Sequence, residues 1–188
     1  IKVNMDEMCL YQYLPIKIPD SILRSKHLEP RLKPFNDLIN MCLVDFSDTH
    51  GYDHYMDSYV YLTVKRMYMC GDKPFNRLGW HSDGFLTDDI NYIWYDKSPT
   101  IFNTSDFNLT MDDKISMVEM SDQAKPNFNT TFSPNTLLKL DEFSIHKVSE
   151  SGFSGMRTFI KISFSMDKYD LIGNSHNHLI KYDWEMKP

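Results

Sequence analysis

The 188-residue chain has little of what several common protein classes require. Its three cysteines, Cys9, Cys42 and Cys70, form no CxxC pair, which argues against a zinc or dithiol motif and favours unpaired thiols in a reducing compartment. No run approaches the roughly 18 apolar residues of a membrane span, and no signal segment opens the chain. These absences predict a cytoplasmic protein that makes no use of a membrane.

Basic residues and common catalytic motifs are also scarce. The 20 Lys and Arg are outnumbered by 26 Asp and Glu, so the net charge of -6 provides no overall field that would attract nucleic acid or anionic lipid. The chain contains no Gly-rich phosphate loop, no GxSxG elbow and no HExxH. Phosphate-loop enzymes, serine hydrolases of that type and zincins are therefore not supported.

What the chain does contain suits one globular domain over residues 1–188, because 41% of its residues are hydrophobic and that length can bury a core. Residues 1–56 carry most of the helical signal and predict a helical N-terminal support. Pro30 and Pro34 suit the entry of the main helix. Its apolar residues recur at helical spacing: Leu32, Phe35, Leu38, Ile39, Cys42, Leu43 and Phe46.

After residue 56 the pattern becomes that of β-strands, rich in aromatic and β-branched residues. Residues 57–166 predict the β core, with the polar stretch 99–132 as an insertion or lid and 167–188 as a C-terminal tail. The expected fold class is mainly β with flanking helices, a sandwich or small barrel. Strands are expected at Tyr59–Met69, Asn91–Tyr95, Thr136–Leu140, Ile145–Val148 and Arg157–Phe164.

Three residues have the types and order of a metal site. His81 and Asp83 are two apart, so in an extended segment their side chains point to one face. His146 follows a predicted strand and supplies a second imidazole. Two imidazoles and one carboxylate on one face leave coordination positions free, a geometry that suits Fe(II). Arg157, eleven residues after His146, is a planar cation able to bind both oxygens of a carboxylate.

The order HxD, a distal His roughly sixty residues later and an Arg about ten beyond it resembles the Fe(II)/2-oxoglutarate-dependent dioxygenases. The resemblance covers about residues 59 to 166 and implies a double-stranded β-helix, the cupin-like jelly roll. It implies Fe(II) on His81, Asp83 and His146 as the catalytic centre, with Arg157 holding 2-oxoglutarate. It also implies consumption of O2 and hydroxylation of a substrate C–H bond, with succinate and CO2 as coproducts.

Other residues are assigned around this centre. Many family members have Arg-x-Ser at the cosubstrate site, but this chain has Phe159 at the Ser position, so Tyr61 is a candidate for the second polar contact with the cosubstrate. Trp80, Trp94 and Tyr95 are candidates for the substrate pocket, although aromatic residues in strands more often belong to the core. His176 and His178 near Asp183 form a weaker metal candidate in the tail.

Two alternative functions use the same residues. In the first, the dioxygenase oxidises a nucleic-acid base or nucleotide, with Lys65, Arg66, Lys73 and Arg77 along a channel in which bases stack. The acidic net charge does not favour that alternative. In the second, the chain is a metal-binding β-sandwich module without turnover.

Overall fold

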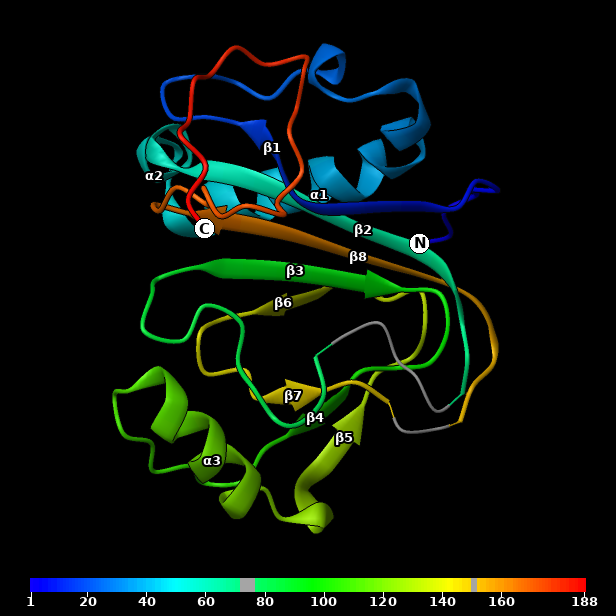
Figure 1. The fold of residues 1–188 in the computed structure, drawn as a ribbon, viewed down its shortest axis with the longest axis vertical. Helices are drawn as coiled ribbons and strands as arrows, with labels where there is room; N and C mark the ends of the chain where they lie inside the picture. Colours follow the sequence, from blue (N-terminus) through cyan, green and yellow to red (C-terminus); the bar gives the residue numbers. More distant parts are fainter. Residues whose placement is uncertain (72–76, 150–151) are drawn as a thin grey trace.

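The computed structural model describes residues 1–71, 77–149 and 152–188 and shows a chain dominated by antiparallel strands (Figure 1). The helical elements are η1 Ser25–His27, η2 Pro30–Phe35, α1 Asn36–His50, α2 Tyr52–Asp57, α3 Asp113–Gln123 and η3 Pro126–Phe128. The strands are β1 Cys9–Lys17, β2 Tyr59–Met69, β3 Ile90–Tyr95, β4 Ile101–Asn103, β5 Asn129–Thr131, β6 Leu138–Leu140, β7 His146–Lys147 and β8 Gly155–Ser165. The mainly β class expected from the sequence is confirmed.

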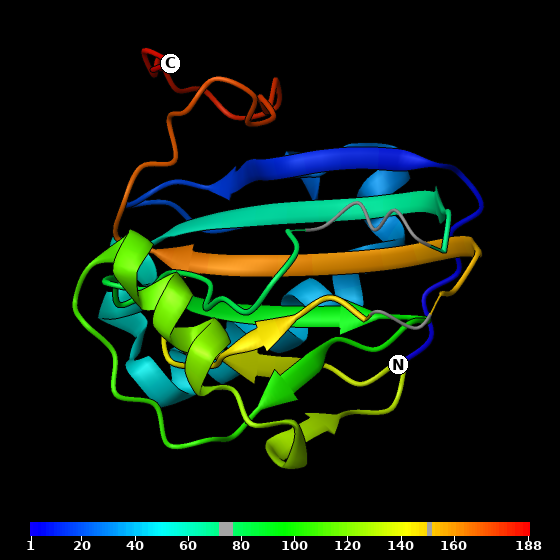
Figure 2. The same cartoon turned by 60° about the horizontal axis from the view of Figure 1, so that its bottom comes forward.

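The strands form two sheets. The larger sheet has the order β1-β2-β8-β3-β6 and the smaller β5-β4-β7, and every pairing between these strands is antiparallel. Figure 2 shows the smaller sheet and α3 in front of the larger sheet, with α1 and the other N-terminal helices behind it. The larger sheet is therefore covered by the N-terminal helices on one face and by the smaller sheet on the other.

Strand β8 separates the two sides of that sheet by simple alternation. Ile160, Ile162 and Phe164 are almost fully buried and pack with the helices in the main core. Phe159 and Lys161 project to the other side, into the space between the sheets. The face of β8 that carries Phe159 and Lys161 is therefore the face that meets a cavity.

The predicted N-terminal helix is confirmed as η2 followed by α1. Pro30 is the first residue of η2, and Pro34 lies inside it, before α1 begins at Asn36. A proline at the start of a helix costs no hydrogen bond, because the first N–H groups have no partner within the helix. The apolar face of α1 packs on β8 through Phe46, whose ring stacks on Phe164 with centroids 4.1 Å apart.

Two regions contain elements that the sequence did not predict. β1 lies within the N-terminal segment expected to be helical; it is an edge strand, a place that tolerates Pro15. The stretch 99–132, expected to be an insertion or lid, contains β4, α3 and β5. Helix α3 begins where the Asp112 carboxylate accepts the N–H groups of Lys114 and Ile115.

The C-terminal tail packs along β1. Asn177 is 2% exposed, and its side-chain amide donates to the carbonyls of Pro15, at 2.8 Å, and His27, at 2.9 Å. The N–H of Ser175 donates to the carbonyl of Gln12 at 2.7 Å. Among the described residues, no helix combines the length and the apolar character that crossing a bilayer would need.

Candidate metal centre

His81 and His146 lie opposite each other on neighbouring extended segments. They form a single antiparallel bridge, in which the N–H of His81 donates to the His146 carbonyl at 3.0 Å and the N–H of His146 donates back at 2.8 Å. Directly opposed residues of an antiparallel pair send their side chains to the same face. The two imidazole rings accordingly lie with centroids 4.6 Å apart.

Each ring is oriented by a backbone carbonyl two residues before it. His81 Nδ1 lies 3.0 Å from the carbonyl oxygen of Gly79, and His146 Nδ1 lies 2.8 Å from that of Ser144. A carbonyl only accepts hydrogen bonds, so Nδ1 carries the proton in both rings. Each Nε2 therefore keeps its lone pair, as in histidines whose second nitrogen is fixed for metal binding.

Asp83 completes the group. Its Oδ2 lies 3.7 Å from His146 Nε2, and one ligand atom from each of the three side chains lies within 4.8 Å of the others. Gly84 turns the chain directly after Asp83 with a φ of +71°, where a Cβ would lie 2.8 Å from Cβ of Asp89. The structure thus brings His81, Asp83 and His146 together, as their order in the sequence predicted.

Burial and neighbouring charges favour the protonation states of His81, His146 and Asp83 that can bind a cation. Burial lowers the pKa of His81 to about 4, with His146 adding to the effect, and burial also lowers the pKa of His146. Burial acts to raise the pKa of Asp83, but Lys161 and the two imidazoles outweigh it and hold this pKa below its usual range. Two neutral imidazoles and an ionised carboxylate result at neutral pH, so the donor set fits a divalent metal.

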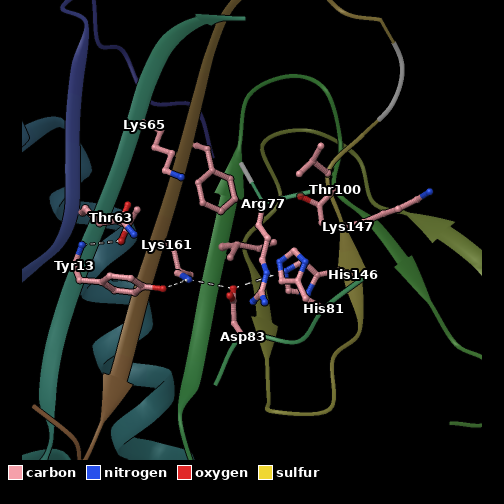
Figure 3. A pocket seen from close by; sticks show the side chains of 14 residues that line it. Tyr13, Thr63, Lys65, Arg77, His81, Asp83, Thr100, His146, Lys147 and Lys161 are labelled. Atoms are coloured by element: carbon pink, nitrogen blue, oxygen red, sulfur yellow. Dashed lines mark hydrogen bonds and ion pairs between the residues drawn. The ribbon is translucent and has the colours of Figure 1, made fainter. Parts of the chain in front are cut away.

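The three side chains face a cavity of about 330 Å³ (Figure 3). Four cationic side chains are among the described residues that line it, whereas Asp83 is the single carboxylate among them. This balance is the reverse of the net charge of the chain, so the described lining of the cavity carries an excess of positive charge. The cationic residues are Lys65, Arg77, Lys147 and Lys161.

Lys161 links Asp83 to the N-terminal strand. It is 7% exposed, and its ammonium lies 3.1 Å from Asp83 Oδ2 and donates to the Tyr13 hydroxyl at 3.0 Å. Tyr13 reaches the site from a bulge in β1, where it adopts a φ of +46°. Neither the pairing of Lys161 with Asp83 nor the arrival of Tyr13 could be read from the spacing of residues in the sequence.

Arg157, the residue expected to hold 2-oxoglutarate, is not among the described residues that line the cavity. It is buried, its Nε donates to the Lys97 carbonyl at 2.9 Å, and its guanidinium carbon lies 5.2 Å from the centre of the Phe159 ring. Burial lowers its pKa to about 10, so the group remains charged at neutral pH. In this structure Arg157 therefore contacts the Lys97 carbonyl and the Phe159 ring.

The aromatic residues proposed to contact the cosubstrate or the substrate are also not among the described residues that line this cavity. Tyr61 is fully buried, and its hydroxyl donates to the Asp167 carbonyl at 2.8 Å. Trp94 belongs to the main core, and the Tyr95 hydroxyl donates to the Phe132 carbonyl at 3.0 Å. Trp80 stacks under the Lys147 ammonium, 4.8 Å from its ring centre.

Among the described residues, no second group of three metal-binding side chains gathers as His81, Asp83 and His146 do. In the C-terminal tail, the rings of His176 and His178 lie edge-to-face with centroids 4.6 Å apart. Among the described residues, Asp183 does not join them to form a metal-binding group. Of the basic residues assigned to a nucleic-acid channel, Lys65 and Arg77 line the cavity, while Lys73 lies outside the described residues.

No protein-family model matches the chain, and no curated protein matches it. Among solved structures the chain is similar to EvdO2 from Micromonospora carbonacea var. aurantiaca, with a TM-score of 0.42 and 11% sequence identity. That similarity covers 71% of this chain and 64% of the EvdO2 chain. A similarity at this level identifies neither the family nor the activity of the chain.

Proposed function

We propose that the chain is an Fe(II)- and 2-oxoglutarate-dependent dioxygenase that hydroxylates a C–H bond of its substrate. The observation that carries the proposal is the group of His81, Asp83 and His146 at the wall of a cationic cavity. Two neutral imidazoles and one carboxylate occupy one side of a metal and leave the other side open, as non-haem Fe(II) oxygenases require. A dianionic cosubstrate suits the lysines and arginine around the open side.

The strand order supports the double-stranded β-helix that this family resemblance implies. Counted from β2, with the extended segment at His81 as the second strand, the two sheets have the orders 1-8-3-6 and 2-7-4-5. That order is the one in which two interleaved Greek keys form a jelly roll. In this reading β1 is an additional edge strand, and it brings Tyr13 to the site.

In the proposed reaction, His81, Asp83 and His146 would hold the iron. The bound iron, with 2-oxoglutarate and O2, supplies the oxidising chemistry, and succinate and CO2 are the coproducts. The carbonyls of Gly79 and Ser144 keep both rings in one orientation. Lys161 holds the Asp83 carboxylate in place.

The cavity favours this proposal over the non-catalytic metal module. A structural zinc site is closed by four protein ligands, whereas this group offers three and opens on about 330 Å³ of space. No specific contact favours the nucleic-acid alternative, because Trp94 and Tyr95 are buried in the core rather than placed to stack a base in the cavity.

Turnover of the cosubstrate tests the proposal. Purified protein supplied with Fe(II), 2-oxoglutarate and O2 should release succinate even without substrate, slowly, in proportion to the O2 consumed. The His81→Ala variant should abolish succinate release, whereas His178→Ala, which changes an exposed tail histidine, should retain it. Folded protein that binds Fe(II) but forms no succinate would contradict the proposal.

A further inference from the structure

We propose that Tyr169, Tyr61 and Trp184 form an electron-transfer chain that discharges an oxidised metal centre to the protein surface when no substrate is bound. Tyr13 connects this chain to the centre. The inference rests on the proposed function for the source of the oxidant, which is O2 reacting with 2-oxoglutarate at the iron. The chain itself follows from ring contacts between β1, β2 and the C-terminal tail.

Aromatic rings follow one another from the cavity to the C-terminal tail. The ring of Tyr13, which lines the cavity, meets that of Tyr169 edge-to-face with centroids 5.0 Å apart. Tyr169 stacks on Tyr61 with centroids 4.2 Å apart and ring planes 4° from parallel. Tyr61 meets Trp184 in a T-shaped arrangement with centroids 6.3 Å apart. Electron tunnelling slows exponentially with distance, so rings at these packing distances form a continuous route.

The cavity end of the route lies beside the metal-binding group. The Lys161 ammonium lies 3.1 Å from Asp83 Oδ2 and donates to the Tyr13 hydroxyl at 3.0 Å (Figure 3). The positive charge of this ammonium disfavours a lasting loss of an electron from Tyr13. Tyr13 is therefore a bridge that the electron crosses, and the oxidised side chain lies further along the chain.

Tyr169 has an acceptor for its phenolic proton, which a stable tyrosyl radical requires. Its hydroxyl donates to Oδ2 of Asp89, a residue that is 3% exposed. Burial raises the pKa of Asp89 above its usual range, which makes this carboxylate a better proton acceptor. When Tyr169 loses an electron, its proton moves along the hydrogen bond to Asp89, and a neutral radical remains. Return of an electron reverses both transfers.

The other two rings are less suited to hold the radical. The Tyr61 hydroxyl donates to the Asp167 carbonyl at 2.8 Å, and an amide carbonyl is too weak a base to take the proton. The Lys168 ammonium lies 5.7 Å from the centre of the Trp184 ring, so its charge disfavours oxidation of that ring. Tyr61 and Trp184 therefore pass electrons to Tyr169, where the radical rests.

Trp184 is the surface end of the chain. Its side chain is half-buried, and the residues on either side of it, Asp183 and Glu185, are exposed. A small one-electron reductant such as ascorbate donates an electron at this end. Full discharge takes two electrons from the reductant, one at a time, and two protons from solvent. It returns the iron to Fe(II), with one oxygen atom of O2 leaving as water, and spares the side chains that line the cavity.

Photo-oxidation of the metal-free protein tests the chain without the metal reaction. Flash-generated ruthenium(III) tris-bipyridine oxidises exposed aromatic side chains, and the wild-type protein should then show a long-lived tyrosyl radical by electron paramagnetic resonance. In D2O, electron-nuclear double resonance should detect one exchangeable deuteron near the radical, the one transferred to Asp89. The long-lived signal should be lost in Tyr169→Phe and in Asp89→Asn, and it should persist in Tyr68→Phe, a control at a 52% exposed position.

The surface end is tested by the decay of the same signal. In Trp184→Phe, added ascorbate should reduce the radical more slowly than in the wild-type protein. Circular dichroism checks the fold of each variant, and the deuteron measurement on the wild-type protein stands if a variant does not fold. A long-lived radical without the coupled deuteron, or one retained in folded Tyr169→Phe, would overturn the proposal.

Substrate-free turnover tests the protective role. With Fe(II), 2-oxoglutarate, O2 and ascorbate, Tyr169→Phe should release succinate at the initial rate of the wild-type protein but lose activity after fewer turnovers. Mass spectrometry should show more oxidised residues around the cavity in this variant, and equal damage in the two proteins would overturn the protective role. If the wild-type protein forms the Tyr169 radical but releases no succinate, the proposed function fails and the electron-transfer chain stands.

Discussion

The ion pair between Lys161 and Asp83 should make a large contribution to the stability of the metal-free protein. The side chain of Lys161 is 8% exposed and that of Asp83 is 21% exposed, so the Lys161→Met change would leave a largely buried carboxylate without its cation. Removing one partner of a buried pair costs about 3–5 kcal/mol. The lower end, about 3 kcal/mol, applies because a fifth of the Asp83 side chain reaches solvent.

Lys139→Met provides a matched control, because it removes the same cation from a surface pair. Lys139 lies 2.8 Å from Asp45, and these side chains are 34% and 49% exposed, so a loss of about 0–1 kcal/mol is expected. Urea unfolding in the presence of a chelator measures both variants. Addition of Mn(II) should reduce the loss of unfolding free energy in Lys161→Met, because the bound cation replaces Lys161 as the counter-charge of Asp83. Equal losses in the two variants, within about 0.5 kcal/mol, would refute the reasoning.

Three further outcomes follow from other parts of the fold. Phe164→Ala should lower the free energy of unfolding by about 3–5 kcal/mol, because its buried ring stacks on Phe46, whereas Phe143→Ala at a 57% exposed position should change it by less than about 0.5 kcal/mol in urea unfolding. Gly84→Ala should lower both the melting temperature and the affinity for Mn(II), because Gly84 has a φ of +71° and the new Cβ would lie 2.8 Å from Cβ of Asp89. An unchanged affinity for Mn(II) would contradict the idea that this turn positions Asp83. Burial lowers the pKa of Lys17 to about 8 in the folded protein. The unfolded chain, in which this pKa is roughly 10.4, therefore binds more protons than the folded protein between these two pH values. The free energy of unfolding should accordingly rise by about 1.4 kcal/mol from pH 7 to 9 in the wild-type protein but not in Lys17→Met.

Periodicity predicted the elements whose side chains alternate clearly. β2 coincides with the predicted run Tyr59–Met69, and β8 extends the predicted Arg157–Phe164 by a few residues, because both strands bury one regular apolar face. β1 was missed because register shifts between Tyr11 and Leu14 and between Pro15 and Lys17 interrupt its alternation. α3 was missed because it buries little apolar surface, mainly Met120, within an otherwise polar stretch.

The metal-binding group was predictable because its members occur in a fixed order on strand-like runs. The grouping of Lys65, Lys161 and Tyr13 in the cavity was not, because it depends on tertiary position. Lys65 approaches Lys161 only through the pairing of β2 with β8, and Tyr13 reaches them only through a bulge. Arg157 is drawn away from the cavity by the Lys97 carbonyl, a contact between segments sixty residues apart.

The most direct test of the account is the optical spectrum of the anaerobic protein with Fe(II) and 2-oxoglutarate. If His81, Asp83 and His146 hold iron with an open side, addition of 2-oxoglutarate should produce a weak visible charge-transfer band in the wild-type protein. The band should be absent from His81→Ala and from Asp83→Ala and should persist in His178→Ala. Folded wild-type protein that binds Fe(II) but shows no band with 2-oxoglutarate would contradict the account.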